Sequence, residues 1–395
     1  MAASTVSVFY FSIVAPNMAA TVTDDHVPAD SLSFQPQVIP SSVRGIVTPS
    51  SNNTTTNAKP LDLPTLHTLI ERYAPILKLH QDEQFLPTSI EDFLSHCTLV
   101  DKKSPAVKVR SPSVSQLPTK GEDHQFYLEL SPDGKPGRLE LAKTYVHALW
   151  QPGSPHTDLQ FWFFYAYNGP GSLHVGGLVL DTPTTSGDID LAPMGEHVGD
   201  WEMAMLRVDN ASHSLNSIWL SQHSRGQFFT HDAIPASFTF QGTRPVIYAS
   251  RNGHANYAAV GPNKSEYRKI GGVPVGLDFF VRNDTTVGGA GKILDCAKHY
   301  ELVSGGWIGG GVVVEPAWAS WPFRWGPEGT STHLTSVAVA EIVRKALGDE
   351  LAKFCPISVL TVLASEILPH FVKGDINGPT SPGKHGSWNG VYPVY

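Results

Sequence analysis

The sequence predicts a mainly β fold: an antiparallel β-sandwich with a short N-terminal helical entry and a C-terminal helical hairpin. Only 16% of the 395 residues are charged, whereas the chain contains 35 Gly and 31 Pro. This composition favours strands and turns over long solvated helices. The apolar runs are short and are separated by Gly, Pro, Asn and Asp, without the helix-length crossovers that repeated βαβ units require.

The chain divides into a leader and one domain. Residues 1–59 end in SSNNTTTNAK, a composition that buries too little apolar area to offset its ordering entropy, so we expect a disordered leader. The stretch Thr5 to Val14 has the length of a signal-peptide core, although no Lys or Arg precedes it, and Met18 is an alternative start. Residues 60–395 are expected to form a single β-rich domain.

Two short helices are predicted at the start of this domain. Apolar residues recur at helical spacing from Pro64 to Tyr73, behind Asp62 as N-cap and with Pro64 in the first turn. Ser89 is the expected N-cap of a second helix that contains Ile90 and Phe93.

Strands are predicted through the middle of the chain and helices near its end. Helical spacing returns in residues 333–347 and 357–371, which we expect to form a hairpin inserted at about 333–373. Neither helix has the basic face of a membrane-surface helix, so packing on the sheet is favoured. The predicted strands are Phe126–Leu130, Ala142–Trp150, Leu159–Tyr167, Trp201–Val208, Leu215–Leu220, Ser237–Phe240 and Val246–Ala249.

Charge and motif content exclude several classes of function. The formal net charge of −8, with scattered Lys and Arg, offers no basic surface for nucleic acid. No apolar run is long enough for a transmembrane helix. The three cysteines show no CxxC spacing, which argues against a thiolate zinc site and favours an intracellular protein. VGGAGK lacks the spacing and hydroxyl residue of a P-loop, and GxSxG and HExxH motifs are absent.

The most informative segment is GEHVGDWEMAMLRVDN, residues 195–210. In a strand, Asp200 and Glu202 project from one face and Trp201 from the other, while His197 arrives from the preceding turn. Two adjacent carboxylates repel each other, and with one imidazole they suit a divalent cation such as Mg, Ca or Mn better than Zn. Asp190, in the polar loop upstream, is a further candidate ligand. The alternative is that either carboxylate pairs with an arginine or lies in solvent.

Two further segments carry candidate site residues. PVIYASRNGHANYA, residues 245–258, leads from an apolar strand into a polar turn. We predict His254 as its general base or extra ligand and Tyr248 as a proton-transfer group. His223 follows another apolar strand, at a position where loop residues often line sites.

Several segments together resemble the vacuolar protein sorting-associated protein 62 family of fungi and plants. These are RYAPILKLHQDEQFLP, FWFFYAYNGPG, GEHVGDWE, PVIYASRNGHANYA and WPFRWGPEG, which span residues 71–329. The family name implies a role in delivering proteins to the vacuole. Residues 378–388 resemble the closing segment of that family.

His197, Asp200, Trp201 and Glu202 are also similar, with the same spacing, to the heptapeptide of the necrosis- and ethylene-inducing toxin family. The resemblance implies a β-sandwich in which the matching His, Asp and Glu bind a divalent cation. The paired cysteines typical of those toxins are not evident in this sequence.

Together these observations predict a divalent-metal-dependent enzyme, of hydrolase or lyase type, that acts on a small or glycosylated substrate. The alternatives are a non-catalytic vacuolar sorting factor and a metal-dependent protein that binds a glycan or lipid headgroup. We expect a cytoplasmic or vacuole-associated protein, or a secreted one if residues 1–20 act as a signal. The sequence does not indicate an oligomeric state.

Overall fold

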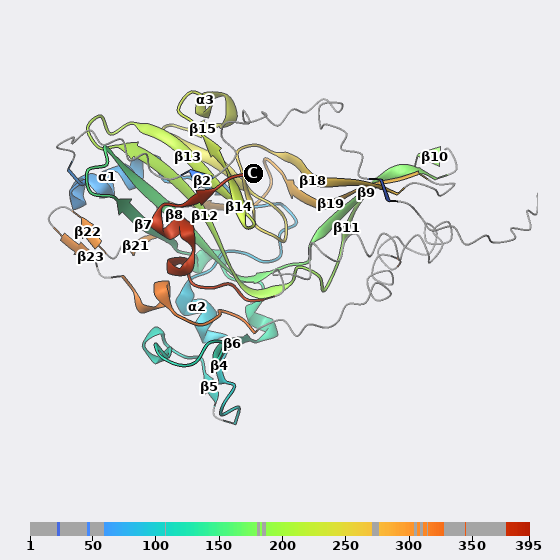
Figure 1. The fold of residues 1–395 in the computed structure, drawn as a ribbon, viewed down its shortest axis with the longest axis horizontal. Helices are drawn as coiled ribbons and strands as arrows, with labels where there is room; N and C mark the ends of the chain where they lie inside the picture. Colours follow the sequence, from blue (N-terminus) through green and yellow to red (C-terminus); the bar gives the residue numbers. More distant parts are fainter. Residues whose placement is uncertain are drawn as a thin grey trace, which may run out of the picture.

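The chain folds mainly into β-sheets, as the sequence predicts (Figure 1). The computed structural model describes residues 59–106, 108–179, 182–183, 187–270, 276–303, 306–308, 311–313, 315–327 and 377–395, together with 22–23, 46–47 and 344. Among these residues, no helix is long and apolar enough to cross a membrane.

A six-stranded sheet forms the centre of the molecule. All neighbouring strands in it are antiparallel except β21, which pairs with β7 in parallel. In spatial order the strands are β14 (Arg225–Phe229), β13 (Leu215–Gln222), β12 (His197–Asp209), β8 (His156–Asn168), β7 (Thr144–Trp150) and β21 (Tyr300–Leu302).

The central sheet is buried on both faces, which explains the unbroken aromatic run of β8. Phe161 and Phe163 pack into one hydrophobic cluster, whereas Trp162 and Phe164, which alternate with them, pack into another. A strand with only one buried face would show polar residues at every second position. The run FWFFYAY is therefore core.

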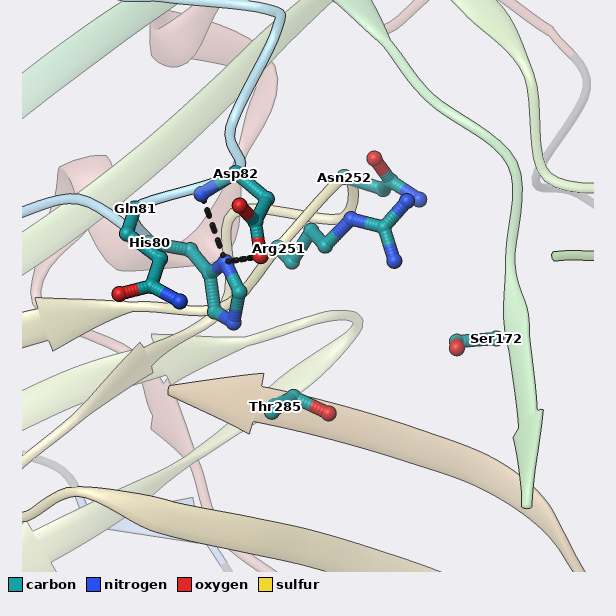
Figure 2. A pocket seen from close by; sticks show the side chains of 7 residues that line it. All are labelled: His80, Gln81, Asp82, Ser172, Arg251, Asn252 and Thr285. Atoms are coloured by element: carbon teal, nitrogen blue, oxygen red, sulfur yellow. Dashed lines mark hydrogen bonds and ion pairs between the residues drawn. The ribbon is translucent and has the colours of Figure 1, made fainter. Parts of the chain in front are cut away.

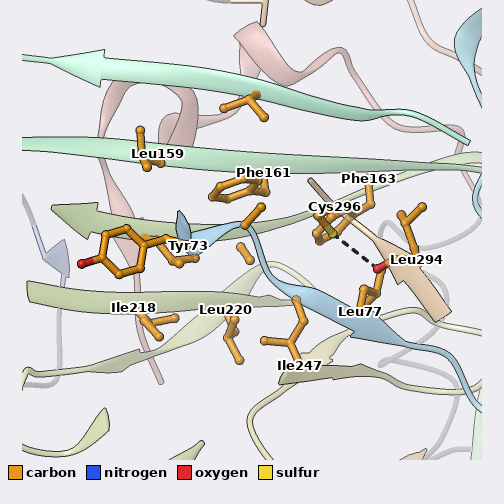
Figure 3. Close-up of a cluster of buried hydrophobic side chains, with 14 of the residues drawn as sticks. Tyr73, Leu77, Leu159, Phe161, Phe163, Ile218, Leu220, Ile247, Leu294 and Cys296 are labelled. Atoms are coloured by element: carbon orange, nitrogen blue, oxygen red, sulfur yellow. Dashed lines mark hydrogen bonds between the residues drawn. The ribbon is translucent and has the colours of Figure 1, made fainter. Parts of the chain in front are cut away.

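A smaller sheet covers one face of the central sheet (Figure 3). Leu77 and Ile247 of the small sheet meet Phe161 and Leu220 of the central sheet in the first cluster. Since β16 and β3 pair in parallel, as β21 and β7 do, the expectation of a wholly antiparallel fold is wrong for these two pairs. The small sheet consists of β15 (Phe240–Gln241), β16 (Arg244–Ala249), β3 (Ile76–Lys78) and β20 (Ile293–Asp295), with β17 (Asn256–Tyr257) beside β16.

A third sheet extends away from the central one, toward the right in Figure 1. The end of its strand β19 and the start of β9 contribute residues to the cavities described below. The strands are β18 (Gly261–Ile270), β19 (Gly276–Thr286), β9 (Ser172–Val179), β1 (Val22–Thr23), β10 (Thr182–Pro183) and β11 (Gly187–Asp190).

The remaining elements form the periphery. The three-stranded sheet holds β4 (Cys97–Asp101), β5 (Lys108–Arg110) and β6 (Phe126–Leu130). Two pairs are β2 (Ile46–Val47) with β24 (Tyr392–Pro393), and β22 (Gly306–Ile308) with β23 (Gly311–Val313). Short 3₁₀ turns cover 114–116, 132–134, 139–141, 317–320, 382–384 and 386–389.

The predicted helical entry is confirmed. Helix α1 (Leu63–Tyr73) begins at Asp62, whose Oδ1 accepts the Thr65 N–H at 2.8 Å, and α2 (Ile90–Ser95) begins at Ser89. The strand predicted at 237–240 is wrong in its first half. Ser237 ends helix α3 (Ile234–Ser237), because proline at its first turn favours a helix start, and β15 begins only at Phe240.

Three expectations concern residues that are mostly outside the described ones. Within the leader 1–59 the structure describes Lys59 and the strands β1 and β2. The signal-like stretch 5–14 lies outside the described residues. So does the helical insertion at 333–373, apart from Arg344.

Candidate metal and ligand site

Among the strands that the structure describes, the first half of β12 has a partner on one side only. β12 pairs with β8 from His197 onward, but with β13 only from Ala204. Directly before the paired residue Ala204, the Met203 N–H donates to the side-chain Oγ of Ser221 in β13 at 2.8 Å instead of to a backbone carbonyl. A cavity of about 310 Å³ lies here, and His197, Asp200 and Glu202 are among its lining residues.

The alternation of β12 separates acidic from aromatic side chains, as the sequence predicts. Asp200 and Glu202 are 8% and 5% exposed, and both line the cavity. Trp201, between them, stacks on Trp318 with ring centroids 5.4 Å apart, within the second hydrophobic cluster. Two carboxylates are thus held side by side in a largely buried place.

His254 provides the positive charge next to Asp200. Its Nδ1 donates to Asp200 Oδ2 at 2.9 Å, and its Nε2 donates to the Phe85 carbonyl oxygen at 3.1 Å. A carbonyl and a carboxylate only accept hydrogen bonds, so both ring nitrogens carry protons and the imidazole is cationic. The fully buried ring stacks on Tyr165 at 3.7 Å, and the Glu83 carboxylate lies 3.8 Å from Nε2.

The pKa values agree with a buried ion triad. Burial alone would lower the pKa of His254, but Asp200 and Glu83 outweigh it and raise this pKa to about 9. Burial would likewise raise the pKa values of Asp200 and Glu83, yet the interactions with His254 hold both below their ordinary range. His254 therefore stabilises the charge of Asp200.

The loop that carries His254 is held in a sparsely populated backbone conformation. Asn252 and His254 have φ values of 66° and 55°, which cost free energy in residues other than glycine. Its anchors are hydrogen bonds from the Arg251 N–H to Thr285 O and from the Asn252 N–H to Glu83 Oε2. These contacts fix the loop against β19 and the segment after β3.

Among the described residues, no cationic side chain pairs with Glu202. Ser221 donates a short hydrogen bond to its Oε2, and Ser221 Oγ in turn accepts from Asn256 Nδ2 at 3.2 Å. Burial, followed by the charge of Asp200, raises the pKa of Glu202 well above its ordinary value. The buried Glu202 carboxyl group therefore binds a proton more tightly than an exposed one does, and a nearby cation would favour its ionised form.

His197 is oriented as metal-binding histidines commonly are. Its Nδ1 donates to the Gly199 carbonyl oxygen at 2.7 Å, so the neutral form of the ring would carry its lone pair on Nε2. The side chain is partly buried and lines the cavity.

Asp284, which the sequence analysis did not single out, contributes a third buried carboxylate. Its Oδ2 accepts from His223 Nε2 at 2.7 Å and from the Tyr257 hydroxyl at 2.6 Å, and both Asp284 and His223 line the cavity. His223 has a φ of 58° in the two-residue turn between β13 and β14. The only signal in the sequence is the position of Asp284 just after the apolar run Phe279–Val281.

The other predicted site residues lie apart from this cluster. Asp190 Oδ2 pairs with Arg251 Nη2 at 2.6 Å. The arginine pairing that the sequence left open was for Asp200 or Glu202, not for Asp190. Tyr248 is buried in β16 beside Ile76 and Val246, and its hydroxyl lies 3.5 Å from Thr239 Oγ1. Neither Tyr248 nor His254 is among the described residues that line the cavity.

The side chains do not form a complete protein cage for a metal ion. Among the described residues, no three His, Cys, Asp or Glu side chains meet closely enough to hold one ion. Yet Asp200 Oδ1 and Glu202 Oε1 make no hydrogen bond to any described residue. Two carboxylates with spare oxygens match the way Mg²⁺ is bound, through one or two carboxylates, waters and ligand oxygens.

Comparison with known proteins identifies a family. The family described as vacuolar protein sorting-associated protein 62 matches residues 39–391. Two Saccharomyces cerevisiae proteins are similar: vacuolar protein sorting-associated protein 62 (24% identity; 48% of this chain and 44% of the relative) and the putative vacuolar protein sorting-associated protein TDA6 (22% identity; 54% and 51%). The chain thus spans about half the length of these relatives.

Some solved structures are also similar to part of the chain. One is necrosis and ethylene inducing protein 2 from the causal agent of witches' broom disease of cocoa (16% identity, TM-score 0.27). Another is NLPPya in complex with mannosamine (14% identity, TM-score 0.27). Each match covers 51% of this chain and 71% of the other chain.

Proposed function

The chain belongs to the vacuolar protein sorting-associated protein 62 family, and we propose that it binds a divalent cation in the cavity at the open edge of β12. Through that cation it holds a small polar ligand. The observation that carries the proposal is the placement of Asp200 and Glu202, which share one strand face and one cavity and are each more than nine-tenths buried.

Electrostatics favours a cation at this position. Two buried carboxylates side by side cannot both stay ionised without compensation. His254 compensates Asp200, whereas the described neighbours of Glu202 Oε2 supply only the neutral Ser221 hydroxyl. A divalent ion that bridges the spare oxygens of the two side chains would supply the missing charge.

The donor set favours Mg, Ca or Mn over Zn. The acidic side chains of the cavity supply carboxylate oxygens, and the His197 imidazole also lines it. Such oxygen-rich sites suit hard cations. His254 is unsuited as a ligand because both of its nitrogens already donate hydrogen bonds. We assign it the role of positioning Asp200.

Turnover of the ligand, by hydrolysis or a lyase reaction, is the second candidate function. It is favoured by His223, which lines the cavity and is oriented by Asp284 as a general base would be. In this proposal His223 takes over the proton transfer that the sequence suggested for His254 or Tyr248. His223→Ala would then still bind the cation and the ligand but would no longer convert the ligand to product. Mass spectrometry of the ligand before and after incubation measures this conversion.

The family name adds a cellular proposal, which is that the chain is a vacuolar sorting factor associated with the vacuole. Sorting does not compete with ligand binding, because a sorting factor can recognise its cargo or membrane through such a cavity. Fluorescent tagging of wild type and Asp200→Asn in yeast cells tests whether vacuolar association depends on the site.

Elemental analysis tests the cation site directly. After dialysis against metal-free buffer and back-titration with Mg²⁺, Ca²⁺, Mn²⁺ or Zn²⁺, the wild-type chain should retain one equivalent of an ion. Asp200→Asn and Glu202→Gln should each lose it while keeping their circular dichroism spectra. Glu129→Gln, which changes a half-exposed carboxylate in β6, is the matched control. An ion content that is equal in all four proteins would refute the proposal.

A further inference from the structure

The cavity that holds the buried carboxylates also holds two arginines that do not pair with them. Arg251 and Arg324 line it together with Asp200, Glu202 and Asp284. Among the described residues, Arg251 forms an ion pair with Asp190, and Arg324 Nη1 donates to the Gly378 carbonyl oxygen at 3.0 Å. Charges of opposite sign thus line one small space without neutralising each other.

Both arginines retain unused hydrogen-bond donors. A guanidinium has five N–H groups. Arg251 uses Nη2 for Asp190, and its buried Nε has no hydrogen-bond partner among the described residues. A buried donor without a partner costs free energy, so a ligand that accepts from this group is stabilised.

Backbone hydrogen bonds anchor the segments that carry the two arginines. Arg251 belongs to the loop that is anchored to Thr285 and Glu83, and Arg324 precedes the buried Trp325, whose N–H donates to the Pro379 carbonyl oxygen at 3.0 Å. A ligand that meets both charges must present positive charge to Asp200 and Glu202 and negative charge to the arginines.

A divalent cation with a phosphate group has this polarity. Planar guanidinium groups bind phosphate oxygens through two parallel hydrogen bonds. Mg²⁺ held by only one or two protein carboxylates commonly completes its coordination with phosphate oxygens of a ligand. We propose that the ligand of this cavity carries a phosphate group, which bridges the cation on Asp200 and Glu202 to Arg251 and Arg324. The inference rests on the proposed cation site.

A second cavity, which shares lining residues with the first, has room for the rest of such a ligand. It has a volume of about 250 Å³, and Arg251 lines both cavities. Figure 2 shows the Arg251 side chain extending from its loop into the space between His80 on one side and Ser172 and Thr285 on the other. Besides Arg251, the Asp82 carboxylate and hydroxyl, amide and imidazole groups line this space. These polar groups suit a hydroxylated remainder, as in a phosphate ester of a polyol.

Calorimetric titration with inorganic phosphate tests the bridge. The full chain saturated with Mg²⁺ should bind phosphate at least about tenfold more tightly than the chain in chelator. Arg251→Gln and Arg324→Gln should each weaken phosphate binding about tenfold or more, while Mg²⁺ binding stays within about twofold. Arg110→Gln, which replaces an exposed arginine of β5, should change neither the phosphate affinity nor the Mg²⁺ affinity. Arg251→Lys keeps the pairing with Asp190 and tests the guanidinium geometry if Arg251→Gln fails to fold.

Vesicles distinguish the two sources of phosphate. If the physiological group is a lipid headgroup, the chain should sediment with phosphatidylcholine vesicles that contain phosphatidic acid, but not with phosphatidylcholine alone, and sedimentation should require Mg²⁺ and Arg251. Binding of inorganic phosphate without sedimentation identifies a soluble phosphate compound. Both outcomes support the proposal.

Failure of this inference differs from failure of the cation site. Mg²⁺ that binds normally while phosphate shows no affinity, or an affinity independent of both arginines, overturns the phosphate bridge and leaves the cation site intact. Absence of any bound cation overturns both.

Discussion

Asp200 Oδ2 and His254 Nδ1 lie 2.9 Å apart, although 54 residues separate them in the chain. The contact joins the open edge of β12 to the loop after β16. His254 is fully buried, and the Asp200 side chain is 12% exposed. The pair therefore holds a strand and a loop together and also fixes the orientation of one proposed cation ligand.

Removal of His254 should leave the charge of Asp200 buried and uncompensated. We expect His254→Gln to lower the free energy of unfolding by about 3 to 5 kcal/mol, the cost typical of breaking one side of a buried ion pair. Urea denaturation measures it, with His231→Gln, an exposed histidine, as control. In the double variant with Asp200→Asn the loss should be smaller than the sum of the single losses. Additive losses would show that the two residues are not coupled.

Ser221 should position Glu202 for the cation. Its hydroxyl group bonds Glu202, Met203 N–H and Asn256, so Ser221→Ala should weaken Mg²⁺ binding about 10- to 100-fold, as is common for residues that orient metal ligands. Ser217→Ala on the same strand is the matched control, since the buried Ser217 hydroxyl has no partner among the described residues. Equal Mg²⁺ affinity in both variants would contradict the assigned role.

Glu202→Gln should stabilise the metal-free protein. Because burial raises the pKa of Glu202 in the folded state, the folded protein binds a proton there more tightly than the unfolded chain does. Stability is therefore lost as pH rises from the ordinary pKa of 4.5 toward the folded pKa. In chelator at pH 7 the variant should gain about 1 to 3 kcal/mol over wild type. The gain should shrink as pH falls toward 4.5, and with saturating Mg²⁺ wild type should be the more stable. A gain independent of pH would argue against a raised pKa.

His147 should make the fold sensitive to acid. It stacks on Trp388 at 3.9 Å, and burial lowers its pKa to about 4 from the ordinary 6.5. Between these two values the unfolded state binds a proton that the folded state does not, so stability falls as pH decreases from 6.5 to 4. The loss reaches about 3 kcal/mol. Thermal melts across this range should show a shallower pH dependence for His147→Gln than for wild type. Parallel curves would locate the acid sensitivity elsewhere.

Much of the local structure could be predicted from the sequence. Helices α1 and α2 begin at their expected caps, Asp62 and Ser89, because a cap needs only a side-chain oxygen a few residues away. β6 has the predicted bounds of Phe126–Leu130. The shared face of Asp200 and Glu202 follows from the period of two in any strand, whatever its partners.

The composition of the site depended on contacts between distant parts of the chain. Nothing local indicates that Asp284 meets His223, 61 residues away, or that Asp190 meets Arg251. Tyr248 resembled a site residue because it lies six residues before His254, yet β16 directs it into the small sheet beside Ile76.

The sequence by itself therefore determined the mainly β character, the helical entry and the acidic face of β12, since each arises from interactions among residues that are close in the chain. Only the tertiary structure decided that His254 compensates Asp200, that Ser221 is the described hydrogen-bond partner of Glu202, and that Arg251 and Arg324 line the same cavity. Charges act through space, and strand pairing, not distance along the chain, sets which charges share a buried cavity.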